Sequence, residues 1–314
     1  MNRRDFLLQS TLAASAGLLS SSLVAAQTPA ATPVPPAPAG NGTGFTALRR
    51  NVGFFIGRGG TIGWLVNPDA LAVVDTQFPD TARTFLDGLP GRGGRHFDVL
   101  LNTHHHADHT GGNPVIKPVS KKVVAHANVP ELLRAAAERA GKPLDPLTLP
   151  DETYAETWRA ALGDEVVSGK YLGAAHTKGD VVITFEKANV VHVGDLCFNR
   201  IYPVVDRPGG GRIRSWITVL DKITTDYPAD AIYVCGHAGP KFEPRCTRDE
   251  LKIFRDYLDG VLTYTQKQIA AGKTKDEIIT LQNLPGFEAF HQPAPNRLGG
   301  NLATAYDELT SKEG

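Results

Sequence analysis

The chain has 314 residues, of which 41% are hydrophobic and 21% charged, and its 33 basic residues balance 33 acidic ones. This composition is ordinary for a soluble globular protein, and the chain is long enough to form one large core. The net charge of zero gives no sign of binding to nucleic acid or to an acidic membrane surface.

The N-terminus carries the pattern of an export signal. Asn2–Leu8 reads NRRDFLL and looks like a twin-arginine motif. An apolar stretch follows, and Val24–Ala26 offers small residues for cleavage. Polar residues such as Gln9 and Ser10 make the stretch a poor permanent membrane span. We therefore expect a signal peptide over residues 1–26, the twin-arginine export machinery as a partner, and a periplasmic or secreted location.

The next segment predicts a linker. Residues 27–45 are rich in Pro, Ala, Gly and Thr, a composition typical of a disordered tether. The remaining residues, 46–314, are expected to form a single domain.

Hydrophobic patterning within that domain predicts alternating strands and helices. The predicted strands span 52–57, 61–67, 70–75, 97–103, 181–186, 189–193 and 231–236. The predicted helices span 80–89, 130–140, 213–226, 247–271, 274–282 and 301–311. Pro130 in a first turn and Gly141 after a last turn support the second of these helices. The mixture indicates an α/β fold.

The segment Thr103–His109 reads THHHADH and directly follows a predicted strand. In an extended loop, alternate side chains share one side, so His104, His106 and Asp108 can converge. His109 can face a second centre only if the backbone turns, and the glycines that follow permit such a turn. Imidazole and carboxylate ligands suit zinc, and also iron or manganese. The alternative is a solvated histidine run that binds metal by accident.

Three further residues argue against that alternative. His176, Asp195 and His237 each follow a strand-like segment. Gly194 and Gly236 precede the last two, where close backbone approach is useful.

With these pieces in order, the chain resembles the metallo-β-lactamase superfamily, and its Asp195 is similar to the bridging Asp of glyoxalase II and lactonases. The resemblance implies a four-layer α/β/β/α sandwich and a dinuclear metal-dependent hydrolase with two zinc ions per chain. It assigns His104, His106 and His176 to the first metal, Asp108, His109 and His237 to the second, and Asp195 to both.

The implied chemistry is hydrolysis of a small-molecule substrate. A hydroxide bridging the two metals is expected to attack the carbonyl of an ester, lactone, thioester or amide, since metal coordination lowers the pKa of water to about 7. Asp108 is expected to orient that hydroxide as well as bind metal. β-Lactamase activity, a mononuclear iron oxygenase and a non-catalytic periplasmic metal-binding protein remain as alternatives.

Three other features bear on the site. The resemblance implies that Asp75 buttresses the histidine loop, although a simple turn carboxylate explains it equally well. Asp180 is a candidate hydrogen-bond partner of His176. Cys197 and Cys235 each lie two residues from an expected ligand, and the sequence favours buried packing for them over a role as metal ligands.

Overall fold

The strands of the domain form two sheets. A computed structural model describes residues 44–311, so the signal peptide predicted over 1–26 and most of the predicted linker lie outside the described residues. Within that range, the first sheet runs in the order β1-β2-β3-β4-β5-β6-β7. Its strands are β1 (Gly44–Arg49), β2 (Val52–Ile56), β3 (Ile62–Val66), β4 (Leu71–Val74), β5 (Val99–Leu101), β6 (Val123–His126) and β7 (Glu152–Tyr154).

The second sheet of the described residues runs in the order β13-β12-β11-β10-β9-β8. Its strands are β8 (Thr157–Leu162), β9 (Glu165–Tyr171), β10 (Val181–Phe185), β11 (Val190–Asn199), β12 (Ile232–Ala238) and β13 (Arg245–Cys246). The two sheets enclose an apolar layer to which both contribute, for example Leu65 and Val99 from one and Val167 and Ile183 from the other.

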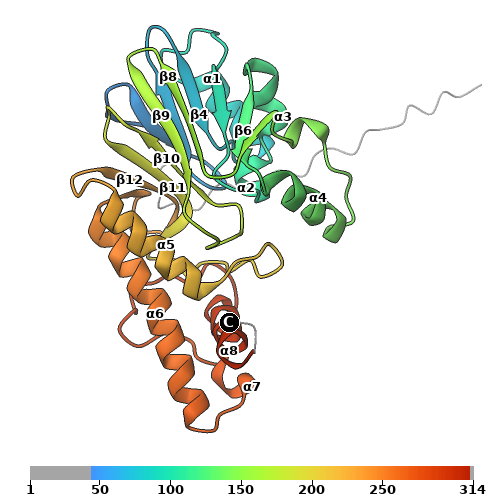
Figure 1. Ribbon diagram of the computed structural model, residues 1–314, viewed down its shortest axis with the longest axis vertical. Helices are drawn as coiled ribbons and strands as arrows, with labels where there is room; N and C mark the ends of the chain where they lie inside the picture. The colour runs from blue at the N-terminus through green and yellow to red at the C-terminus, as the bar shows by residue number, and fades with distance from the viewer. Residues whose placement is uncertain (1–43, 312–314) are drawn as a thin grey trace, which may run out of the picture. The chain divides into compact units, whose positions relative to one another are not determined.

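Helices cover the outer face of each sheet (Figure 1). Phe85 of α1 (Pro79–Gly88) packs with Leu100 of the first sheet. On the second sheet, Trp216 of α5 (Ile213–Asp226) and Phe254 of α6 (Arg248–Ala270) share a cluster with Val193. The expected four-layer α/β/β/α sandwich is therefore confirmed.

Further helical elements complete the described part of the chain. They are α2 (Ala107–Thr110), α3 (Asn113–Ile116), α4 (Val129–Arg139), α7 (Lys275–Ile278), α8 (Arg297–Thr310) and the 3-10 turns η1 (Lys117–Val119) and η2 (Pro146–Thr148). Between residues 44 and 311 we find no helix with the length and apolar character needed to cross a bilayer.

Most sequence predictions agree with these bounds to within two residues, and helix 213–226 agrees fully. Four differ. The helix predicted over 274–282 is a single turn, α7, and the last predicted helix, 301–311, begins four residues earlier, at Arg297. The strand predicted over 189–193 continues to Asn199 as β11. The strand β1 begins at Gly44, so the last two residues of the predicted linker belong to the sheet. Strands β1, β6 to β9 and β13 were not predicted.

Parallel pairing brings the two halves of the site to one edge. β4 pairs in parallel with β5, so Asp75 after β4 and Thr103 after β5 emerge at the same edge of the first sheet. β11 and β12 are also parallel, and they carry Asp195 and His237. Asp195 does not end its strand as predicted, because β11 continues to Asn199 through a register irregularity around Gly194.

Candidate metal centre

The histidine loop turns sharply after its second ligand. His106 precedes α2, and its carbonyl accepts hydrogen bonds from the backbone N–H groups of His109 and Thr110. In this helical turn, side chains no longer alternate between two sides as they do in an extended chain. The backbone turn that His109 requires is therefore made by α2, and Gly111 follows it rather than creating it.

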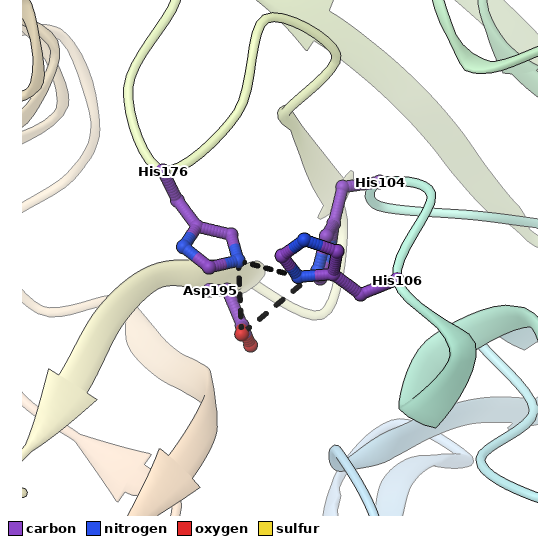
Figure 2. Close-up of side chains that lie close together, drawn as sticks. All are labelled: His104, His106, His176 and Asp195. Atoms are coloured by element: carbon purple, nitrogen blue, oxygen red, sulfur yellow. Dashed lines mark hydrogen bonds and ion pairs between the residues drawn. The ribbon is translucent and has the colours of Figure 1, made fainter. Parts of the chain in front are cut away.

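A first group of side chains gathers His104, His106, His176 and Asp195, with one ligand atom of each within 4.8 Å of the others. Figure 2 shows their side chains converging on one point. His176 Nε2 lies 2.9 Å from His106 Nδ1. Asp195 Oδ2 lies 3.4 Å from His176 Nε2 and 3.9 Å from His104 Nε2. Three imidazoles and a carboxylate thus face a common centre.

A second group gathers Asp108, His109 and His237. His237 Nε2 lies 3.1 Å from Asp108 Oδ2 and 3.4 Å from His109 Nε2. Asp195 also reaches this group, because its Oδ1 lies 3.0 Å from His109 Nε2 and its Oδ2 lies 3.5 Å from His237 Nε2. Asp195 therefore stands between two sets of three ligands.

The other nitrogen of each inner imidazole is held by a neighbour. His109 Nδ1 lies 2.7 Å from Asp75 Oδ2, and His104 Nδ1 lies 3.1 Å from Thr103 Oγ1. His176 Nδ1 donates to the Val204 carbonyl at 2.8 Å. Such contacts fix the ring tautomer, so that Nε2 of these three rings is left to face the centre.

Asp75 makes the loop contacts that the resemblance implied. Its carboxylate accepts from the Thr103 backbone N–H at 2.8 Å and from the Thr103 hydroxyl at 2.7 Å, and it is fully buried. The same carboxylate holds His109. It therefore ties both ends of the histidine loop to the end of β4.

Asp206 was missed by the sequence reasoning. Its Oδ2 lies 2.9 Å from His106 Nε2, which leaves His106 Nδ1 as the atom facing the centre. Asp206 lies in the connection between β11 and α5, where no motif or periodicity marks it. Only its hydrogen bond identifies it.

Asp180 does not contact the ring of His176 as predicted. Its two oxygens accept from the backbone N–H and the hydroxyl of Thr177, at 2.7 and 2.8 Å. It therefore stabilises the turn that follows His176, and the ring itself bonds to Val204.

One buried atom of the centre, His104 Nε2, lacks a hydrogen-bond partner among the described residues. Since buried polar atoms are nearly always hydrogen-bonded, this nitrogen needs a partner of another kind. The surrounding atoms are imidazole nitrogens and carboxylate oxygens, which is the donor set that divalent zinc prefers. The residues present therefore fit divalent metal ions.

The protonation of the two groups differs. Burial, reinforced by neighbouring imidazoles, holds the pKa of His104 well below its ordinary value and lowers that of His176 to about 4. Burial also lowers the pKa of His237, but the negative charges of Asp195 and Asp108 outweigh burial and raise this pKa to about 10. The pKa of His109 is likewise raised, against its burial, by Asp195 and Asp108. Protons on these imidazoles occupy the positions where cations would bind, so metal binding must displace them.

Sequence comparison identifies the family. The sequence profile of the metallo-β-lactamase superfamily matches residues 56–237, a span that contains all seven candidate ligands. The chain belongs to this superfamily. A hydroxyacylglutathione hydrolase of Rhodospirillum rubrum is 26% identical over 170 residues, which are 54% of this chain and 57% of that protein.

Solved structures share the metallo-β-lactamase fold. The stereoselective inverting sec-alkylsulfatase of Pseudomonas sp. has a TM-score of 0.66 at 16% identity over 85% of this chain and 50% of that one. The metallo-β-lactamase of Pontibacter korlensis has a TM-score of 0.56 at 18% identity over 69% and 98%. The chain thus spans about half the length of the curated relative and of the sulfatase. The superfamily and the curated relative support a hydrolase, and the solved structures show the fold.

Proposed function

We propose that this protein is an exported hydrolase with two zinc ions, which cleaves an ester, lactone, thioester or amide. The observation that carries the proposal is the place of Asp195. Its carboxylate oxygens lie within 3.9 Å of ring nitrogens from both groups of ligands. Seven ligands, divided three and three around one shared carboxylate, match two metal ions better than one.

The exposed side of the centre suggests where a substrate binds. The side chains of His106, Asp108 and His237 are 24%, 30% and 23% exposed. Asp195 and His109 are nearly or fully buried behind them. A substrate therefore approaches over the exposed three, and the buried residues form the floor of the centre.

Two zinc ions would supply a water acidic enough to act as a nucleophile near neutral pH and a positive charge to stabilise an oxyanion. Burial raises the pKa of Asp108, but His109 and His237 outweigh it and hold the pKa below its ordinary value. Asp108 therefore stays ionised at neutral pH and can accept a hydrogen bond from the attacking water. The hydrogen bonds of Asp75 to His109 and of Asp206 to His106 would keep these two imidazoles oriented during the reaction.

The relative's name directs the choice of substrates. Hydroxyacylglutathione is a thioester, so thioesters belong in the first screen together with lactones, esters and β-lactams. An exported enzyme would be separated from the glutathione of the cytosol. This separation favours a substrate other than a glutathione thioester. The twin-arginine motif at Arg3 and Arg4 supports export.

The test combines metal analysis with turnover. We expect close to two zinc ions per chain in gently purified protein, and hydrolysis of at least one compound in the screen. Asp195→Asn should lose at least one ion and more than about 100-fold of the activity, because loss of a ligand exceeds the 10–100-fold typical of residues behind the ligands.

Asp164→Ala is the control, because Asp164 is an exposed partner of Arg50 and lies outside the ligand set. It should keep both ions. A single iron with no second metal would refute the dinuclear zinc centre and favour an oxygenase. Two zinc ions without any turnover across the screen would favour the accessory metal-binding protein.

A further inference from the structure

The fold collects every cysteine of the chain at one point. The sequence contains three cysteines, Cys197, Cys235 and Cys246. They lie on the neighbouring strands β11, β12 and β13. All three are buried, with exposures of 0%, 0% and 3%.

The three sulfur atoms are close enough to share one ion. One Sγ of each lies within 4.8 Å of the others, and Cys235 Sγ lies 3.3 Å from Cys246 Sγ. At a metal–sulfur bond of about 2.3 Å, the sulfur ligands of one ion lie roughly 4 Å apart. The Cys235–Cys246 separation is shorter than that value, and the other two separations do not exceed 4.8 Å. We propose that Cys197, Cys235 and Cys246 form a thiolate site for a soft metal ion, Cu(I), distinct from the histidine–aspartate centre.

The donor set selects the ion. Thiolates bind soft ions such as Cu(I) and zinc, whereas hard ions prefer oxygen. Structural zinc almost always takes four ligands. Among the described residues this cluster contains three potential ligands, all sulfur. Three sulfur ligands in a site closed to solvent match the low coordination number of Cu(I) better than the four ligands of zinc.

Two other arrangements compete with the metal site. A disulfide between Cys235 and Cys246 would use the shortest separation and leave Cys197 as a thiol. Alternatively, all three remain thiols and pack as small apolar groups, with Cys235 Sγ donating to the Pro244 carbonyl at 3.1 Å. The convergence of all three cysteines favours the site, because a disulfide needs only two and simple packing needs none.

The test uses the full chain with the histidine–aspartate centre loaded with zinc. The protein is prepared in copper-supplemented cultures and, in parallel, titrated anaerobically with Cu(I) against a competing Cu(I) chelator. We expect one copper per chain beyond the zinc, retained after chelator washing. X-ray absorption at the copper edge should show sulfur as the nearest neighbour.

Variants locate the copper. Cys246→Ser should weaken Cu(I) binding at least tenfold and leave the zinc content unchanged, because the cysteine cluster shares no residue with the histidine–aspartate groups. His106→Asn should impair zinc binding and keep the copper. If Cys246→Ser does not fold, Cys246→Val, which preserves apolar packing, takes its place.

Three results would overturn the site. The first is no copper by either route of loading. The second is a copper spectrum with nitrogen or oxygen as the nearest neighbours. The third is one titratable thiol, instead of three, in the denatured metal-free protein, which would show that two of the cysteines form a disulfide.

Discussion

Asp206 Oδ2 lies 2.9 Å from His106 Nε2, across a separation of 100 residues in sequence. The same aspartate donates its backbone N–H to the His176 carbonyl at 3.1 Å. One residue of the connection between β11 and α5 thus holds the ring of one candidate ligand and the main chain of another.

The first prediction concerns this contact. Asp206→Ala frees the His106 ring to rotate, so zinc affinity should fall about 10–100-fold. Competition with a zinc chelator measures the loss. Asp164→Ala, which removes an exposed partner of Arg50, is the control and should bind zinc like the wild type. Equal affinity in the two variants would remove Asp206 from the metal centre.

The second prediction concerns the space beside Asp195. A Cβ at Gly236 would collide with Asp195 Oδ1, whereas a Cβ at Gly300 in α8 meets nothing within 4 Å. Gly236→Ala should therefore displace the carboxylate, reduce metal content and destabilise the fold by about 1–3 kcal/mol. Gly300→Ala should stabilise it by roughly 0.5–1 kcal/mol, because alanine favours the helix.

Thermal unfolding and elemental analysis of both glycine variants check this pair. Retention of full metal content in Gly236→Ala would mean that Asp195 tolerates displacement. That outcome contradicts a bridging role with strict geometry.

The third prediction concerns pH. Burial raises the pKa of Asp180 to about 7, against the hydrogen bonds from Thr177. The unfolded chain has a lower pKa, 3.8, so between these values the folded state binds more protons and stability falls as pH rises. The free energy of unfolding that is lost through the ionisation of Asp180 is at most about 4 kcal/mol, and the loss is complete above pH 7.

Asp180→Asn removes that titration. In metal-free protein, the melting temperature of the variant relative to the wild type should therefore increase from pH 4 to pH 7 and level off above it. If the melting temperatures of the variant and the wild type change in parallel over this pH range, Asp180 titrates near its ordinary pKa.

The fourth prediction concerns targeting. Changing Arg3 and Arg4 together to Lys should leave precursor in the cytoplasm, because the arginine pair is the signal read by the export machinery. Cell fractionation measures how much precursor remains in the cytoplasm. Unchanged accumulation in the periplasm would refute twin-arginine export and leave the metal centre unaffected.

The amino-acid sequence was enough to predict most of the candidate ligands and most of the strands and helices that carry them. The THHHADH loop reveals four of the seven candidate ligands because they are adjacent in the chain, and His176, Asp195 and His237 stand out through their flanking strands. Helix 213–226 was predicted to the residue, because its apolar side chains recur with helical spacing.

The way in which these residues come together depends on the packing of the two sheets. Strands such as β8 have weak patterning of their own and form through pairing with β9, so local sequence does not reveal them. The contact of Asp206 with His106, the Val204 partner of His176 and the meeting of three cysteines all join residues far apart in the chain. The hydrophobic periodicity of the sequence does not predict such contacts, because they depend on strand order and register rather than on neighbouring residues.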